Sequence, residues 1–211
     1  MKLRKTKKFI TILIVVAILA ITGTVLGING FFGGGVTIPS DTMTRGLVGY
    51  WGMDEGRGTT TADISGNNNT GIFQTAAASP AWTKGKVSGA LKFDGTDDYV
   101  DAGSATVLNP TEAITIEAWV NPAAAGQTSQ RFVSREYAYT IWLQGSGYFG
   151  GLIGVGNDWP GVGILASTYT PSVNAWTHLA MTYDRNNILL FANGVQVASK
   201  AYAAAIGTVS T

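Results

Sequence analysis

Short apolar runs broken by turn residues make up the chain from Arg45 onward. The runs include "GLVGYWGM", "ALKFDG", "AITIEAWVNP", "YTIWLQG", "THLAMTYD" and "NILLFANG". Gly, Asn, Asp or Pro separates them at intervals of about eight to twelve residues. None of the runs repeats apolar residues at the spacing of a helix face. This pattern is typical of an all-β protein built as an antiparallel sandwich or barrel.

One run alternates strictly between apolar and other residues. On a strand, its apolar residues would share one side, namely Ile114, Ile116, Ala118 and Val120. The opposite side would carry Thr115, Glu117 and Trp119. Trp119 is therefore predicted either to pack under a second layer or to lie on an outer face.

The pair Asn193-Gly194 stands between two strand-like runs, "LLFA" and "VQVA". A type I′ hairpin turn needs positive φ at both central residues, and Asn-Gly is the pair that supplies this most readily. The sequence therefore predicts a β-hairpin that turns at residues 193–194.

The N-terminus has a different pattern. A basic segment (1–8) precedes an uncharged apolar segment (9–28), and a Gly/Ser/Thr-rich stretch (29–45) has the composition of a flexible linker. A spanning helix needs about 20 apolar residues, whereas the apolar region of a signal peptide has about 7–15. The length favours a transmembrane anchor, and Thr22-Gly23-Thr24 leaves a cleaved signal sequence open. In either case the domain over residues 46–211 is expected outside the cytoplasm.

Charge and composition narrow the class of partner. The chain has 14 Lys and Arg against 13 Asp and Glu, and five of the basic residues lie in the first eight. The remainder is therefore acidic, with 9 basic and 13 acidic residues, which argues against nucleic acid as a partner.

The absence of cysteine excludes disulfides and, in an exported chain, indicates a bacterial or archaeal source. The single histidine, His178, argues against a catalytic zinc site or a histidine-based triad and is expected to be a hydrogen-bonded structural residue.

Five stretches occur in an order that resembles a known family. They are "GLVGYWGMDEGRGTTTADISGNNNTG", "GKVSGALKFDGTDDYVDAG", "AITIEAWVNP", "NAWTHLAMTYD" and "LLFANGVQV". Together they resemble the LamG-like jelly-roll family of the concanavalin A-like superfamily, whose relatives include laminin G domains and pentraxins. The resemblance spans Gly46 to Val197 and implies an antiparallel two-sheet sandwich. It also implies closing strands that follow these motifs, so the sandwich over residues 46–211 is expected to lack its last strands.

The stretch "FDGTDDYVDAG" carries four aspartates, Asp94, Asp97, Asp98 and Asp101. Aspartates in tight turns commonly accept hydrogen bonds from their own backbone, and this interpretation is favoured here. Calcium is the alternative, because it prefers carboxylate and amide oxygens on loops, and the resemblance implies calcium in some members of the family.

The candidate calcium ligands combine two loops. In "DISGNNN", oxygen-bearing side chains recur at alternate positions, and Asp94 and Asp97 could approach them in the fold. The candidate ligands are Asp63, Ser65, Asn67, Asn69, Asp94 and Asp97. The spacing departs from an EF-hand, whose twelfth position would be Gln74 in place of Glu. A Ser-Gly-Asn turn explains the loop equally well.

An enzyme is not expected. A glycosidase on this fold would need two carboxylates flanking the scissile bond. Glu112 and Glu117 are the nearest pair of glutamates, but on a strand residues five apart face opposite sides. A glycoside hydrolase remains the least favoured alternative.

Aromatic residues are the candidate ligand contacts. Trp142, Tyr148 and Trp159 lie in or beside the expected loops, where exposed rings can stack on sugars or hold a protein partner. Their burial in the core is the alternative, and Trp159 in "GNDWPGVG" is the least compatible with it.

The function expected from the sequence is a non-catalytic recognition module, tethered to the cell surface by its N-terminal helix. It would bind glycan or an extracellular protein through rim loops. The alternative is an assembly subunit that completes its sandwich by strand addition from another chain.

Overall fold

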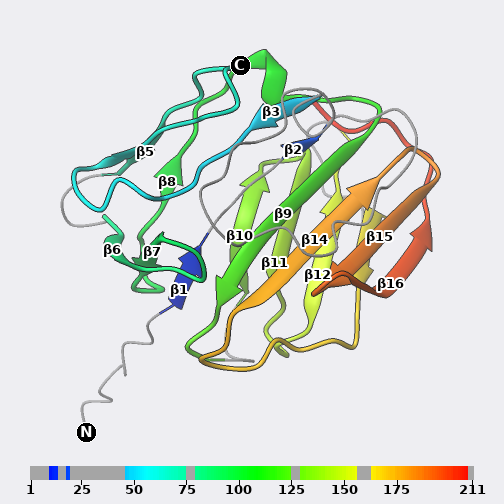
Figure 1. The fold of residues 1–211 in the computed structure, drawn as a ribbon. Coiled ribbons are helices and arrows are strands. Elements are labelled where there is room, and N and C mark those ends of the chain that lie inside the picture. Colours follow the sequence, from blue (N-terminus) through cyan, green and yellow to red (C-terminus); the bar gives the residue numbers. More distant parts are fainter. Residues whose placement is uncertain are drawn as a thin grey trace, which may run out of the picture.

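The computed structural model describes residues 10–13, 18–19, 46–74, 79–124, 129–155 and 163–208, the first two segments by their backbone alone. These residues form strands and one short 3₁₀ turn, η1 (Thr106–Leu108) (Figure 1). The all-β architecture predicted from the sequence is therefore confirmed.

The strands form three sheets. The largest contains β1 (Ile10–Leu13), β2 (Ile18–Leu19), β3 (Leu47–Gly49), β6 (Ala81–Lys84), β7 (Gly89–Phe93), β9 (Ile114–Asn121), β14 (Thr177–Tyr183), β15 (Asn187–Ala192) and β16 (Val195–Ala201). A four-stranded sheet runs in the order β10 (Gln130–Arg135), β11 (Tyr139–Leu143), β12 (Phe149–Ile153) and β13 (Ile164–Ala166). A small sheet joins β4 (Thr60–Thr61), β5 (Gly71–Phe73) and β8 (Val100–Asp101). All pairings within the sheets are antiparallel.

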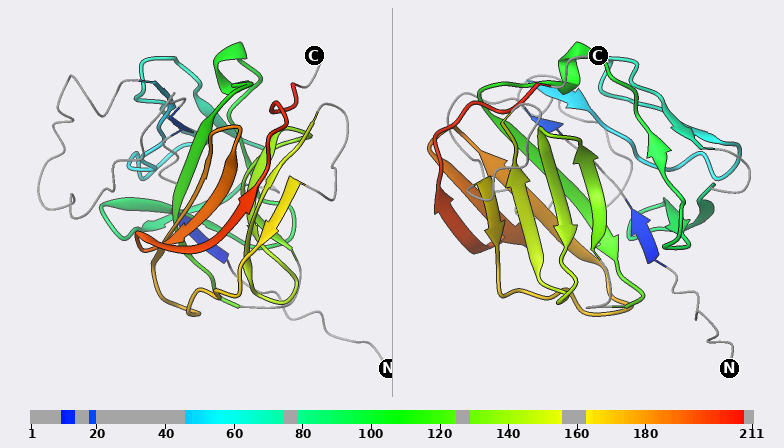
Figure 2. Two further views of the ribbon diagram at one scale, coloured as in Figure 1. Left: turned by 90° about the vertical axis from the view of Figure 1, so that its right-hand side faces the viewer. Right: turned by 180° about the vertical axis from the view of Figure 1, so that it is seen from behind.

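The four-stranded sheet stacks on the β9, β14 and β15 part of the largest sheet, so that two layers enclose the main core (Figure 2). The layers approach closely at Gly151, where a Cβ would lie 2.5 Å from Met181 Sδ and 2.7 Å from Leu190 Cδ2. Fully buried side chains from both layers fill the space, among them Ile116, Ile141, Leu143, Phe149, Ile153, Leu179, Met181 and Leu190.

Strand β9 has the alternation that its sequence predicts. Ile114, Ile116, Ala118 and Val120 are buried, and the residues between them are partly exposed. Trp119 lies on the outer side, where its ring meets the ring of His178 at a centroid distance of 5.3 Å. Lys86 Nζ lies 5.6 Å from the centroid of the Trp119 ring. Trp119 is thus partly buried on the side of β9 opposite Ile116.

The predicted hairpin is also confirmed. Strands β15 and β16 pair antiparallel, with Asn193 at φ 50° and Gly194 at φ 79° in the turn between them. The side chain of Asn193 adds a further contact, because its Oδ1 accepts a hydrogen bond of 3.0 Å from the backbone N–H of His178.

The N-terminal segment differs from the expected helix over residues 9–28. The backbone of Ile10–Leu13 is a strand between β7 and β9, and Ile18–Leu19 pairs with β3 and β9. The β-branched residues Ile10, Thr11 and Ile12 favour such an extended backbone. The other positions of the segment lie outside the described residues. Within the described ranges, no helix has the length and apolar character needed to cross a membrane.

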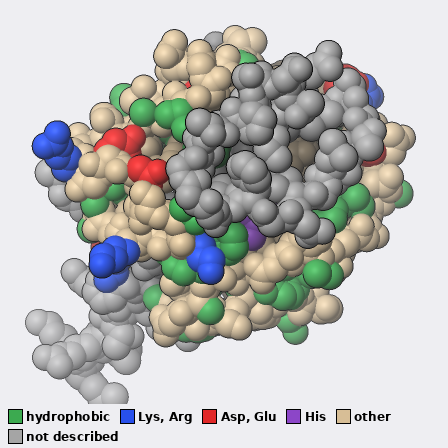
Figure 3. All heavy atoms as spheres, in the orientation of Figure 1, with side chains coloured by type: hydrophobic (Ala, Val, Ile, Leu, Met, Phe, Trp, Pro, Cys, Tyr) green, Lys and Arg blue, Asp and Glu red, His purple; other side chains and the backbone are tan. Residues whose placement is uncertain are grey.

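Acidic and basic side chains lie close to one another on the face shown in Figure 3.

Candidate functional site: the outer face of the four-stranded sheet

One row of residues crosses the four-stranded sheet from edge to edge. Arg131 pairs with Trp142, Trp142 pairs with Gly150, and Gly150 pairs with Ala166. The next residue along β12, Gly151, faces the other layer. Since successive strand residues point to opposite faces, the row that contains Trp142 lies on the outer face of the sheet.

Gly150 leaves room for the indole of Trp142. A Cβ at position 150 would lie 3.1 Å from Trp142 Cζ2 and 3.2 Å from Cε2. The ring therefore lies directly over the Gly150 backbone, and one side of it is in contact with the sheet. Trp142 is partly exposed and does not belong to the core cluster.

A shallow hollow of about 150 Å³ adjoins the indole. Its lining is Ser129, Arg131, Thr140, Trp142 and Leu152. Arg131 is exposed, and Thr140 Oγ1 donates a hydrogen bond of 2.9 Å to the carbonyl of Val133. The hollow thus offers an aromatic surface, an apolar floor and the hydrogen-bond donors of a guanidinium. Sugar rings, which have an apolar face and polar edges, match this combination.

The three predicted aromatic contacts have different positions. Trp142 lies near the end of β11, beside the turn that leads to β12. Tyr148 lies in the turn between β11 and β12 and is 41% exposed, so both rings belong to the same hairpin. Trp159 lies outside the described residues. Sequence reasoning missed Arg131 and Gly150, because only the strand register places them beside Trp142.

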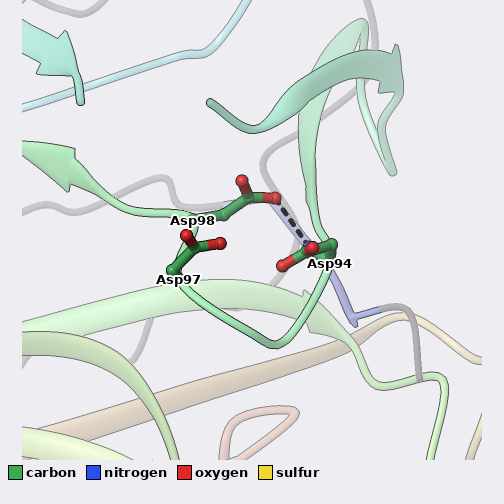
Figure 4. A group of neighbouring side chains, drawn as sticks. All are labelled: Asp94, Asp97 and Asp98. Atoms are coloured by element: carbon green, nitrogen blue, oxygen red, sulfur yellow. Dashed lines mark hydrogen bonds between the residues drawn. The ribbon is translucent and has the colours of Figure 1, made fainter. Parts of the chain in front are cut away.

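The aspartates of "FDGTDD" have the contacts expected of turn residues. Asp98 Oδ2 accepts a hydrogen bond of 2.7 Å from the Asp94 N–H (Figure 4). Asp94 Oδ1 accepts one of 2.8 Å from the Thr96 N–H. Partial burial raises the pKa of Asp98, the Asp94 N–H opposes this increase, and the nearby Asp94 and Asp97 carboxylates add to it. The turn interpretation accounts for these contacts.

The loop from Asp63 to Asn69 is held by hydrogen bonds. Asp63 Oδ1 accepts from the N–H groups of Tyr50 and Ser65, and Oδ2 accepts from the N–H and the Nδ2 of Asn69, all at 2.9 Å. Burial opposes ionisation of Asp63, but the hydrogen bonds from Ser65, Tyr50 and Asn69 outweigh it and hold its pKa below the ordinary value. Asn67 Nδ2 donates to the carbonyls of Leu47 and Val48.

Of the six predicted calcium ligands, Asp63 and Asn69 are hydrogen-bonded to each other, and Asp94 and Asp97 belong to an acidic cluster. Among the described residues, the acidic cluster with the geometry for a cation is Asp94, Asp97 and Asp98, whose ligand atoms lie within 4.8 Å of one another. Asp98, which the sequence analysis left out, is a member, and Asp63 is not. The carboxylates fit a hard cation chemically, although Asp94 and Asp98 each already accept a backbone hydrogen bond.

The two glutamates considered for hydrolysis have separate partners. Glu112 is ion-paired with Arg185 at 2.8 Å, and Glu117 lies 3.5 Å from His178 Nε2 on the outer side of β9 and β14. His178 contacts both Glu117 and the Trp119 ring, and its hydrogen-bonded structural role stays a prediction.

Comparisons with solved structures identify domains of similar fold. One is the binding domain of Paraclostridial Mosquitocidal Protein 1, with 16% identity and a TM-score of 0.53, over 71% of this chain and 40% of that chain. Another is domain 4 of AbnA, a GH43 extracellular arabinanase from Geobacillus stearothermophilus, in complex with arabinotriose. It has 18% identity and a TM-score of 0.51, over 70% of this chain and 72% of that chain. At these identities the likeness concerns the fold alone.

A search of curated proteins found no match. A laminin G-like family model, described as the concanavalin A-like lectin/glucanases superfamily, matches residues 94–211, more than half of the chain. The chain therefore belongs to the concanavalin A-like lectin/glucanases superfamily, as its motifs and its stacked antiparallel sheets both indicate.

Proposed function

We propose that this protein is a non-catalytic carbohydrate-binding module whose binding surface is the outer face of the four-stranded sheet. The observation that carries the proposal is the row of Arg131, Trp142 and Gly150. Gly150 lets the indole lie against the sheet, so the opposite side of the ring can stack on the apolar face of a sugar. Arg131 can then donate hydrogen bonds to sugar oxygens at the edge of the ring.

Two further facts support a binding role. A domain of similar fold, domain 4 of AbnA, was solved in complex with arabinotriose. Glu112 and Glu117, the pair considered for hydrolysis in the sequence, have separate partners in Arg185 and His178. A protein ligand on the same face is the alternative to this proposal.

The proposed place of action is outside the cytoplasm, with the apolar segment 9–28 as a tether to the membrane. The support comes from the sequence, namely five basic residues followed by an uncharged run. Calcium remains a prediction. Of its predicted ligands, Asp94 and Asp97 lie in one acidic cluster with Asp98, which we add as a candidate donor, and the proposed sugar contact does not involve this cluster.

A glycan array followed by calorimetry on the full chain tests the proposal. Stacking and the loss of buried area predict that Trp142→Ala weakens sugar binding by about tenfold or more, which corresponds to about 1.4 kcal/mol. Gly150→Ala is the sharper variant, because it keeps the indole but displaces it from the sheet. Gly145→Ala is the matched control, since a Cβ there meets no atom within 4 Å.

The proposal fails if the array detects sugar binding that Trp142→Ala and Gly150→Ala both leave unchanged. It also fails if the array detects no sugar at all while a protein ligand binds this face.

A second candidate function is assembly by strand addition. It is favoured by one observation, that β7 and β9 are joined only through β1 in the described part of the sheet. The space between them therefore accepts one strand, and another chain could supply it. Oligomers that form without sugar as the concentration rises, measured by light scattering, would support assembly over a purely monomeric binding module.

A further inference from the structure

A second and larger hollow lies away from the Trp142 face. Its volume is about 390 Å³, within the range of small-ligand sites. It lies between β8 of the small sheet and β10 at the edge of the four-stranded sheet, and it shares no lining residue with the hollow beside Trp142.

The floor of this β8–β10 cavity is apolar and its rim is polar. Buried side chains form the floor, namely Trp51, Met53, Leu108, Phe132 and Tyr139. Tyr99, Asp101, Ser134 and Arg135 form the rim, and the Tyr99 side chain is exposed (52%). An apolar floor with a few convergent polar groups is the usual construction of a small-ligand site.

Arg135 is the chemically distinctive group of the rim. Its Nε donates to Asn109 Oδ1, and its Nη1 lies 3.5 Å from the carbonyl of Gly103, so neutral oxygens hold one side of the guanidinium. Within the described ranges Arg135 forms no ion pair with a carboxylate, although it is only partly exposed. Covering it with a neutral ligand would remove water from an uncompensated charge, whereas a carboxylate would compensate that charge through paired hydrogen bonds.

The other rim groups suit hydroxyls and a ring. Asp101 Oδ1 accepts a hydrogen bond of 2.8 Å from the Gly103 N–H, and the exposed carboxylate has further acceptor capacity. Ser134 is exposed and can donate or accept. Asp101 would repel a bare anion, so the ligand that fits carries hydroxyl donors together with its negative charge.

We propose that the β8–β10 cavity binds a sugar ring that bears a carboxylate, that is, a uronic acid residue of a glycan. The carboxylate pairs with Arg135, the hydroxyls reach Asp101 and Ser134, and the apolar face of the ring contacts Tyr99 and the floor. This site is independent of the sugar surface at Trp142, and either can exist without the other.

Calorimetry of the full chain with digalacturonic acid and with its methyl ester tests the proposal without any mutation. The acid is expected to bind at least tenfold more tightly than the ester, which keeps the hydroxyls and the ring but lacks the charge. Raising the salt concentration should weaken binding of the acid and leave binding of the ester nearly unchanged.

Variants then locate the site. Arg135→Gln and Tyr99→Ala should each weaken acid binding about tenfold or more. Arg57→Gln is the matched control and should leave acid binding unchanged, because Arg57 is exposed and lines neither hollow. Because Arg135 also holds Asn109, thermal unfolding must show that Arg135→Gln is folded. If Arg135→Gln is not folded, Tyr99→Ala provides the test, because Tyr99 is exposed.

Equal binding of acid and ester would overturn the proposal, and so would acid binding that depends on Trp142 instead of Arg135. No binding of the acid at millimolar concentration would also overturn it. None of these results would contradict the proposed function, which fails only through the Trp142 and Gly150 variants and the glycan array.

Discussion

At the scale of single residues, Asp63 shows how a loop that resembles a metal site can be organised by its own backbone. Its carboxylate accepts four hydrogen bonds of 2.9 Å, which tie the loop to Tyr50, Ser65 and Asn69. Asn69 Nδ2 also donates to the carbonyl of Val48 on β3, so the loop is fixed to the large sheet. The alternating oxygen side chains that suggested calcium in the sequence are thus used inside the protein.

Asp63→Ala is expected to lower the free energy of unfolding by about 3 kcal/mol or more. The substitution leaves several donors without a partner, and each such buried group costs about 1–3 kcal/mol. Urea denaturation at pH 7 measures the effect. Asp97→Ala is the control, because Asp97 is exposed and the change is expected to stay within about 0.5 kcal/mol.

Ionisation of the Asp63 carboxylate should make the stability of the protein depend on pH. The pKa of Asp63 is lower in the folded protein than its ordinary value of 3.8, so the folded state favours the ionised form. Its contribution to stability is therefore complete above about pH 4 and is lost as the pH falls through the folded pKa. Stability should fall less steeply below pH 4 in Asp63→Ala than in the wild type, and equal slopes would contradict this assignment.

Sequence reasoning succeeded at this scale where one strand or one turn decides the outcome. The alternation of β9 predicted that Ile116 and its alternate neighbours are buried, and Asn193-Gly194 predicted the hairpin between β15 and β16. The contact of Trp142 with Gly150 depends on the register between β11 and β12, and the β8–β10 cavity depends on how two sheets meet. Neither can be inferred from positions along one strand.

At the scale of elements, the close approach of the two layers depends on one residue of β12, Gly151. The Cα of Gly151 faces Met181 of β14 and Leu190 of β15 so closely that a single methyl group would overlap both side chains. The two consecutive glycines of β12 have opposite roles, since Gly151 admits the other layer and Gly150 admits the indole on the outer face.

Gly151→Ala is expected to destabilise the protein by about 1–3 kcal/mol, the usual cost of adding a methyl group to a packed core. Gly145→Ala, in the turn after β11, is the control and should change stability little, because its Cβ meets nothing within 4 Å. Chemical denaturation measures both.

A double-mutant cycle identifies the cause. Met181→Ala removes the side chain that the new methyl group would meet, so the double variant should be more stable than the sum of the single effects predicts, by about 1 kcal/mol. Additive effects would mean that the cost of Gly151→Ala arises elsewhere.

At the scale of the whole molecule, the strand observed in the N-terminal segment is incompatible with the membrane anchor proposed for the same residues. As strand β1, Ile10–Leu13 pairs with β7 at Leu91 and with β9 at Val120, both through Ile12, and so joins two parts of the large sheet. As a membrane anchor, the same residues would belong to a helix of about 20 residues in lipid. One copy of the segment cannot do both, so membrane insertion would leave the edges of β7 and β9 unpaired and available to another strand.

Amide hydrogen exchange on the full chain tests this coupling. In aqueous buffer, Ile12→Pro is expected to accelerate exchange about tenfold or more at those amides of β7 and β9 that face β1, because proline cannot donate to the ladder and disfavours the strand. Ile12→Val, which keeps the β-branched side chain and the N–H, is the control. Strand β11 pairs only within the four-stranded sheet and provides the internal reference.

The same measurement in phospholipid nanodiscs distinguishes the two roles. If the segment leaves the sheet to enter the bilayer, the β7 and β9 amides of the wild type in nanodiscs should exchange as fast as those of Ile12→Pro in buffer. A peptide of residues 10–19, added in excess, should then restore the protection of these amides. In buffer, the wild type and Ile12→Pro could also show the same protection of β7 and β9. That result would mean that β1 does not hold the two strands together. The assembly hypothesis would then lose its structural basis.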